Sequence, residues 1–145
     1  MSHRAPWECS FAKEQRSRCL PGKKPRTDHE YFEILSLCIL QAGLGWASVR
    51  KNWPRYRSAF LNFEIAKLAQ AAPAALLRRP GALRNAKKDA AHVANAQEFE
   101  RIRAEHRTFG RYLRTVKSEK DACTILQERF RHVGPYTAEF YLHCV

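Results

Sequence analysis

The chain has 145 residues, and its 26 lysines and arginines against 14 aspartates and glutamates give a formal net charge of +12. Hydrophobic residues make up 45% of the sequence and include 8 Phe, 5 Tyr and 3 Trp, which excludes wholesale disorder and predicts one domain with a substantial core. No apolar run is long enough to cross a membrane, and no apolar stretch follows the basic residues near Met1, so neither a membrane span nor a secretory signal is expected.

The first 27 residues are predicted to form an irregular, basic arm. Prolines and a glycine interrupt any helix there, and six lysines and arginines lie among residues 13–26. Such an arm either follows a phosphate backbone or is simply solvated.

A central helix is predicted to follow this arm. Thr27 and Glu30 have the spacing of a capping box, so the helix is expected to begin after Thr27. Residues 31–40 are apolar nearly all round, which is typical of a buried helix. We expect the helix to end at Gly43, which readily adopts a left-handed conformation.

The remaining elements are also predicted to be helices. A helix from Trp46 to Trp53 is expected to stop at Pro54, which suits the first turn of a third helix. Apolar residues at helical spacing then predict short helices up to Pro73, followed by helices over 74–79, 83–106, 109–116 and 122–130. Nothing alternates with a period of two, so the fold class is predicted to be all-α, with residues 28–145 forming one helical domain.

Near the C-terminus the sequence predicts helix, tight turn and helix over residues 130–138. Gly134 lets the backbone come close to another group, and Pro135 presets the first turn of the second helix. Amides at a helix start have no intrahelical acceptor, so a phosphate oxygen suits them, and Arg129 and Arg131 add positive charge nearby. The pattern resembles a helix-hairpin-helix, which clamps a DNA backbone independently of sequence; an ordinary structural turn is the alternative.

The positive charge is spread over the whole chain, which favours association with a polyanion, most commonly a nucleic acid. A merely basic surface is the alternative. The cysteines are odd in number and lack short paired spacings, so we expect reduced thiols in a cytoplasmic protein. They are Cys9, Cys19, Cys38, Cys123 and Cys144.

Three blocks of sequence occur in the order of a known family. They are QAGLGW at residues 41–46, GALRN at 81–85 followed by Lys88 and Asn95-Ala96, and FRHVGPYT at 130–137. They resemble the DNA-3-methyladenine glycosylase I family, which carries segments of the types G-x-Q-A-G-L-S-W, G-I-I-R-N-x-x-K with N-A further on, and F-x-x-V-G. The last block shares with that family the absence of the hairpin's first glycine, since His132 stands there.

The resemblance implies a helix-hairpin-helix DNA glycosylase fold and hydrolysis of the N-glycosidic bond of alkylated purines such as 3-methyladenine in double-stranded DNA. An alkylated purine carries positive charge and leaves readily, so the enzyme must mainly flip the nucleotide out and stack the cationic base against aromatic rings. Trp46 matches the family's pocket tryptophan and is expected to stack on the base; core packing is the alternative for its ring. The residues expected to bind the DNA backbone are Arg131, Val133, Gly134, Tyr136 and Thr137.

The family's pocket glutamate, which hydrogen-bonds the alkylated base, falls at Cys38. A thiol cannot replace a carboxylate acceptor at full strength. Glu33, five residues earlier, lies roughly 140° away around a helix. Gln41 shares a face with Cys38 and keeps a carbonyl acceptor, so we place the catalytic position at Cys38 and Gln41, with base recognition either surviving through Gln41 or lost.

The family's zinc ligands have no clear counterpart in this sequence. Cys9 or Cys19 together with His143 and Cys144 would form a replacement set, but two adjacent ligands suit one tetrahedral ion poorly. We therefore expect no metal and no other cofactor.

Two other interpretations stay open from the sequence. The first is a non-catalytic helix-hairpin-helix DNA-binding relative whose base pocket is disabled at Cys38. The second is a basic helical module that binds RNA or protein. Whether the protein is the enzyme or the non-catalytic relative, we expect a monomer that binds double-stranded DNA with alkylated bases. We also expect it to be associated with the nucleoid and to have no contact with a membrane.

Overall fold

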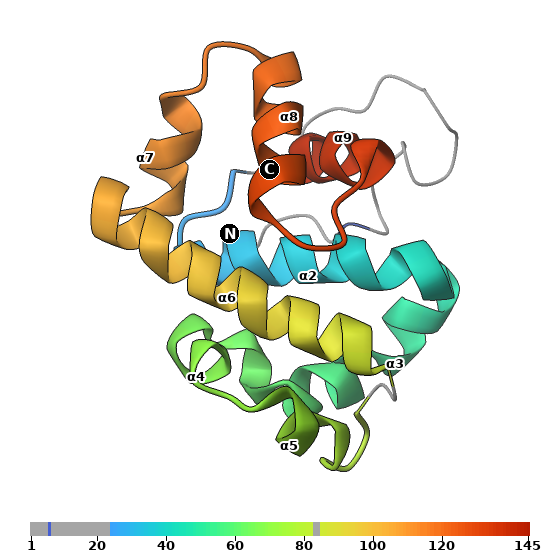
Figure 1. The fold of residues 1–145 in the computed structure, drawn as a ribbon. Helices are drawn as coiled ribbons and strands as arrows, with labels where there is room; N and C mark the ends of the chain where they lie inside the picture. The colour runs from blue at the N-terminus through green and yellow to red at the C-terminus, as the bar shows by residue number, and fades with distance from the viewer. Residues whose placement is uncertain (1–5, 7–23, 83–84) are drawn as a thin grey trace.

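The computed structural model describes Pro6, residues 24–82 and residues 85–145, and over these residues it contains helices and no strand (Figure 1). The all-α expectation is confirmed. What was expected of the other residues of the arm, and of Leu83 and Arg84 in the second block, lies outside the described residues. No helix in the described ranges is long and apolar enough to span a membrane. The elements are α2 (Asp28–Leu44), α3 (Trp46–Ala59), the short 3-10 turn η2 (Leu61–Phe63), α4 (Ile65–Ala69), α5 (Pro73–Leu77), α6 (Ala86–His106), α7 (Phe109–Arg114), α8 (Glu119–Arg129) and α9 (Pro135–Cys144).

Helix α2 begins where the capping pair predicted it. The Thr27 hydroxyl accepts the N–H of Glu30 at 3.2 Å. The Glu30 carboxylate accepts the N–H of Arg26 at 2.8 Å, so it reaches one residue beyond the cap. The first bond satisfies an amide that the first turn of a helix leaves without a backbone acceptor, and the second fixes the chain just before the cap.

The end of α2 differs from the prediction. The helix continues through Gly43 and ends at Leu44, and the N–H of the following Gly45 donates to the Gln41 carbonyl at 2.8 Å. Leu44, the last residue of the helix, is packed against the core. The expected stop at Gly43 was therefore wrong, because burial outweighed the local tendency of that glycine.

Helix α3 does not stop at Pro54 either. It runs unbroken from Trp46 to Ala59 with Pro54 inside, on the exposed side. Val49 and Tyr56 lie two turns apart and are both buried on the opposite side. The missing backbone hydrogen bond at Pro54 is thus offset by burial of one continuous apolar face.

After α3 the chain makes a left-handed turn. Leu61, Asn62 and Phe63 all have positive φ, between 52° and 57°, which costs roughly 1–2 kcal/mol per residue for L-amino acids. The turn places Phe63 in the core, where its ring stacks on Trp53 with centroids 5.1 Å apart. Burial of this large ring offsets the backbone cost.

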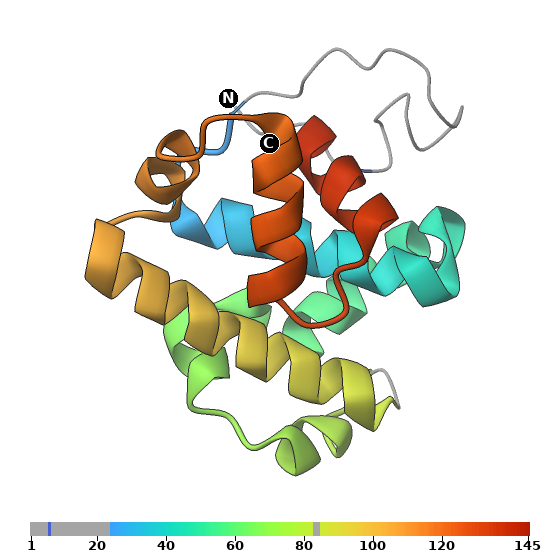
Figure 2. The same cartoon turned by 45° about the horizontal axis from the view of Figure 1, so that its top comes forward.

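Helix α6 divides the molecule into two groups of helices. Figures 1 and 2 show α4 and α5 on one side of it and α7, α8 and α9 on the other. It runs antiparallel to α2, because Lys88 near its start bonds the Ile39 and Leu40 carbonyls while Arg103 near its end pairs with Asp28. α6 begins at Ala86, three residues later than predicted.

The predicted helix, turn and helix near the C-terminus is confirmed. α8 is capped by Ser118, whose hydroxyl accepts the N–H of Asp121 at 3.1 Å, and α9 begins with Pro135 in its first turn. Both helices pack against each other, and α9 also packs against α2. The hairpin is therefore fixed to the central helix.

Candidate functional site

The corner between α2 and α3 positions Trp46. Gly45 has φ 77° and ψ 156°, a conformation essentially restricted to glycine, and Trp46 follows it as the first residue of α3. The Trp46 ring stacks against Phe140 of α9, with centroids 5.2 Å apart and an interplanar angle of 30°. Phe140 lies 6.1 Å from Tyr136. Trp46, Phe140 and Tyr136 form an aromatic row from this corner to the first turn of α9.

The two ends of the row differ in exposure. Phe140 is fully buried, Trp46 is half-buried and Tyr136 is 41% exposed. Phe140 thus supports the Trp46 ring from the core side, while part of the tryptophan surface stays open to solvent. A half-buried indole that is supported by a buried ring can stack on a planar ligand with its exposed part.

Cys38 lies on α2 and is fully buried beside Tyr141 of α9. The Tyr141 hydroxyl donates to the Tyr31 carbonyl at 2.8 Å, and burial, with the nearby Cys38 adding to the effect, raises the pKa of Tyr141 well above its ordinary value. The structure therefore places Cys38 and Trp46 against consecutive residues of α9. It gives the Cys38 thiol no exposure to solvent.

Gln41 lies one turn beyond Cys38 on α2 and is half-buried. Its backbone carbonyl accepts the N–H of Gly45, so Gln41 belongs to the turn that sets the position of Trp46. Its side chain keeps an amide oxygen that accepts hydrogen bonds and an NH2 group that donates them. Of the two residues placed at the catalytic position, Gln41 is the one that reaches the surface.

The α8–α9 turn has an open side. Gly134 has an extended backbone, with φ −88° and ψ −178°, and a Cβ placed on it would meet no atom within 4 Å. Among the residues expected to contact DNA, Val133 and Thr137 are buried, and Arg131, Gly134 and Tyr136 are exposed. The side chains of Val133 and Thr137 thus anchor the turn, and only the backbone groups of these two residues can reach a ligand.

His132 stands in the turn with φ 58°. This left-handed conformation explains why related hairpins place glycine there, since glycine adopts it without steric cost. Histidine is among the residues that tolerate it better than most. His132 therefore adopts the left-handed conformation that this turn requires.

Asn95 of α6 holds this turn in place. Its side-chain oxygen accepts the N–H of Arg131 at 2.8 Å, and its NH2 group donates to the Arg131 carbonyl at 3.2 Å. Asn95 is 1% exposed, so both bonds are shielded from water. The sequence marked Asn95 as part of the second block without indicating this role.

Lys88 of the same block ties α6 to the other half of the site. Its ammonium group donates to the carbonyls of Ile39 and Leu40 at 3.4 Å and 3.3 Å. Burial lowers the pKa of Lys88. Lys88 and Asn95 together connect α6 to the Cys38–Gln41 turn and to the hairpin.

Arg129 is half-buried and paired within the protein, and does not extend beside the turn. Its Nε lies 2.7 Å from the Glu98 carboxylate, and its guanidinium sits 5.0 Å above the Tyr112 ring. These contacts direct it toward α6 and α7. Of the two arginines that were expected to add charge at the hairpin, Arg131 is the exposed one.

Asp89 and His92 are two fully buried polar residues of α6 that the sequence did not single out. Neither the Asp89 carboxylate nor the His92 ring nitrogens have a hydrogen-bond partner among the described residues. Burial raises the pKa of Asp89 to about 6. Burial lowers the pKa of His92 to about 3, with the charges of Lys88 and His132 contributing. Asp89 and His92 are at helical spacing with the apolar Phe99, and this pattern in the sequence could have indicated that they are buried.

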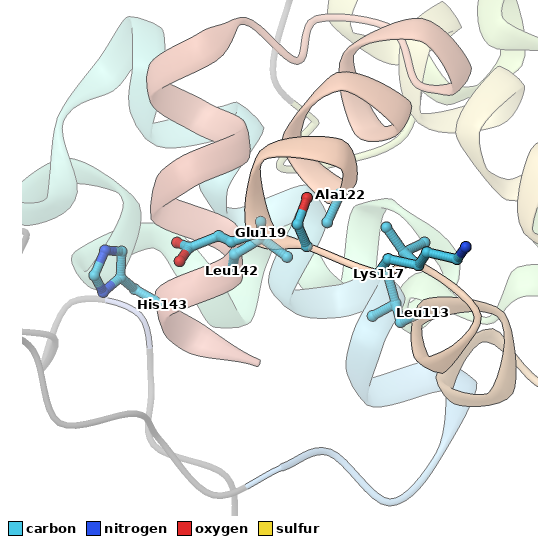
Figure 3. A pocket seen from close by; sticks show the side chains of 8 residues that line it. Leu113, Lys117, Glu119, Ala122, Leu142 and His143 are labelled. Atoms are coloured by element: carbon cyan, nitrogen blue, oxygen red, sulfur yellow. The ribbon is translucent and has the colours of Figure 1, made fainter.

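A separate pocket of about 460 Å³ lies at the far end of α9 from Tyr136, against the start of α8 (Figure 3). Leu142, Glu119 and His143 are among its lining residues, and Figure 3 shows the Glu119 side chain extending toward His143. Within residues 24–82 and 85–145 no group of three or more His, Cys, Asp or Glu side chains is arranged to hold a metal ion. Cys144 is buried in the core.

A family model described as methyladenine glycosylase matches residues 22–142. The chain belongs to the methyladenine glycosylase family. The resemblance carried by the three sequence blocks is therefore confirmed.

Solved structures share the fold of this family member. A 3-methyladenine DNA glycosylase I from Staphylococcus aureus has a TM-score of 0.74 and 21% identity, covering 97% of this chain and 90% of its own. A crystal structure of a 3-methyladenine DNA glycosylase I has a TM-score of 0.72 and 20% identity, and the match covers 86% of this chain and 80% of that one. A solution structure of a 3-methyladenine DNA glycosylase I, studied for alkylated-base recognition, has a TM-score of 0.68 and 22% identity. The match covers 83% of this chain and 78% of that one.

Proposed function

We propose that this protein hydrolyses the N-glycosidic bond of alkylated purines such as 3-methyladenine in double-stranded DNA. One observation carries the proposal within the family: a single helix, α9, serves both halves of the site. Its first turn forms the exposed side of the hairpin, and its Phe140 stacks against the half-buried Trp46. DNA gripped at the hairpin would thus present a flipped base close to the tryptophan.

Trp46 stacks on the flipped base in this proposal. An alkylated purine is cationic, and the face of an indole attracts a cation by roughly 0.5–2 kcal/mol. Gln41 orients the base through its amide, since it shares the α2 face with Cys38 and reaches the surface. Cys38 lies buried behind Gln41 on the same helix, where the family's carboxylate would stand.

The reaction needs little acid catalysis. The positive charge on the alkylated purine is neutralised when the C1′–N bond breaks and the base takes the electron pair. Water then forms the new C1′–O bond and loses a proton to solvent. The protein contributes mainly by extruding the nucleotide and holding it, at a cost of a few kcal/mol for unstacking.

The hairpin and Arg131 would bind the DNA backbone. The first turn of α9 is not capped by a side chain, and its amides and helix dipole suit a phosphate oxygen. The space in front of Gly134 lets that phosphate approach. We further propose that residues 28–145 act as one domain and as a monomer, with residues 1–27 as a basic arm, in the cytoplasm with the nucleoid.

A non-catalytic DNA-binding relative is the second candidate. It is favoured by one observation, the complete burial of Cys38 at the position where the family's glutamate would accept a hydrogen bond from the base. Such a protein would keep the hairpin and bind duplex DNA without releasing a base.

Release of free 3-methyladenine from methylated duplex DNA distinguishes the two candidates. We expect release by the wild type, loss of release in Trp46→Ala and nearly unchanged binding of unmodified duplex. Trp53→Ala is the matched control, because Trp53 is a half-buried tryptophan of the same helix that stacks on Phe63 instead of the row. Duplex binding without release by the wild type would support the non-catalytic relative, and equal loss of release in both variants would assign Trp46 to packing.

A further inference from the structure

A second pocket lies at the opposite end of α2 from the aromatic row. It has a volume of about 420 Å³ and is formed by the segment before α2 and the beginning of α7. Figures 1 and 2 both show this segment running beside α7. Because α2 has 17 residues, the two ends of the helix are about 25 Å apart. The pocket is therefore separate from the position proposed for the base.

Four cationic side chains line this pocket. Lys24 and Arg26 come from the segment before α2, and Arg111 and Arg114 come from α7. All four residues are exposed, and none of them forms a salt bridge with another described residue. Four like charges around one hollow repel each other, so the site attracts an anion.

One carboxylate also lines the pocket, but its charge is already compensated. Oδ1 of Asp28 accepts the N–H of Phe109 at 2.9 Å. Oδ2 of Asp28 lies 3.2 Å from Nε of Arg103. Asp28 therefore fixes α7 to the start of α2 and leaves the positive charge of the pocket in excess.

Neutral hydrogen-bond donors complete the lining. Thr27 and Thr108 contribute hydroxyls, and Tyr31 contributes its phenol. The phenol lies beside Gly110, since a Cβ on Gly110 would stand 3.4 Å from the Tyr31 hydroxyl, an ordinary contact distance. Burial raises the pKa of Tyr31, with the positive charge of Arg114 acting in the opposite direction, so the phenol stays protonated and able to donate.

We propose that this pocket binds phosphate groups and that, in the protein–DNA complex, it holds a backbone phosphate away from the hairpin. Arginine forks and hydroxyl donors match the oxygens of a phosphate. The DNA source of the phosphate rests on the proposed function. The phosphate chemistry of the pocket rests on its own lining residues.

The test uses the double variant Arg111→Gln/Arg114→Gln in the full chain. Lys67→Gln/Arg78→Gln is the control, because it removes the same charge from exposed positions on α4 and directly after α5, on the other side of α6. Binding of an unmethylated duplex is measured across salt concentrations, and binding of inorganic pyrophosphate is measured by calorimetry. Base release from methylated duplex is measured separately.

We expect the pocket variant to lose pyrophosphate binding and to bind duplex about tenfold or more weakly at low salt. The slope of log K against log salt concentration should become shallower by about 1 to 2, one unit for each phosphate that the variant no longer neutralises. In the control variant, the affinities for pyrophosphate and for duplex should each change by less than about twofold. Loss of pyrophosphate binding with unchanged duplex binding would support a phosphate site and overturn the DNA source in favour of a small phosphorylated ligand.

Equal behaviour of the pocket variant and the control with both probes would overturn the proposal. Failure of the wild type to release 3-methyladenine would contradict the proposed enzyme activity and leave the pyrophosphate result as an independent readout. Thermal unfolding of both variants should match the wild type, because the substituted side chains are exposed.

Discussion

Replacing Asp89 with asparagine is expected to stabilise the protein at neutral pH. Asp89 is fully buried in α6, and its carboxylate has no hydrogen-bond partner among the described residues. Burial raises its pKa from 3.8 to about 6. The folded protein must therefore accommodate an unpaired buried charge once the pH exceeds that value.

The magnitude follows from the difference between the folded and unfolded pKa. A shift of about 2 pKa units corresponds to about 3 kcal/mol. Because the folded pKa is the higher one, the contribution of the protonated group is fully present below pH 3.8 and is lost as the pH rises through about 6. Asp89→Asn should then raise Tm by about 6–12 °C at pH 7.5 and leave it nearly unchanged at pH 3.5.

His92 gives this prediction a second signature. Its pKa is lowered from 6.5 to about 3, so it destabilises the fold as the pH falls below 6.5. Between about pH 4 and 6, Asp89 and His92 have opposite effects on how the free energy of unfolding of the wild type changes with pH. In Asp89→Asn the histidine effect remains alone, and the loss of stability on acidification should steepen by up to about 1.4 kcal/mol per pH unit.

Chemical denaturation from pH 3.5 to 8 measures both effects. Asp121→Asn on α8 is the control, because Asp121 is exposed and its substitution should change stability by less than about 0.5 kcal/mol. If Asp89→Asn is no more stable than the wild type at pH 7.5, the Asp89 carboxylate is stabilised in the fold and the reasoning from burial is refuted.

Three further predictions concern the hairpin. Gly134→Ala should weaken duplex binding severalfold with an unchanged Tm, because the added methyl meets no protein atom but occupies the space left for a phosphate; normal binding would remove the close approach from the proposal. Asn95→Ala should lower the free energy of unfolding by about 2–4 kcal/mol in urea titrations, since it removes two buried hydrogen bonds to Arg131; a decrease below about 1 kcal/mol would contradict their importance. His132→Gly should be at least as stable as the wild type, whereas His132→Val should cost about 1–2 kcal/mol, and the reverse order in thermal melts would disprove the left-handed turn.

Several features of the fold follow from short stretches of sequence. Thr27 and Glu30 start α2, and Pro135 starts α9, because caps and prolines act within one helical turn. The alternation of apolar residues with a helical period predicted the long α6 in the same way. The three blocks also indicated Trp46 and the hairpin as candidate site residues before any contact was known.

Other features were decided by contacts between distant residues. The stops expected at Gly43 and Pro54 were wrong, because packing of Leu44 and Tyr56 against the core outweighs a local preference of a few kcal/mol. Such burial depends on which helices lie opposite. No local pattern reports that arrangement.

The candidate site shows the same division. Trp46 was indicated by its motif, but its stacking partner Phe140 lies 94 positions away, and Asn95 holds a turn 36 positions away. The burial of Asp89 and His92 likewise depends on how α6 is rotated against its neighbours. Short motifs thus predicted the starts of α2 and α9 and the residues to consider for the site. Which side chains meet there follows from tertiary packing, because hydrophobic burial is a property of the assembled core.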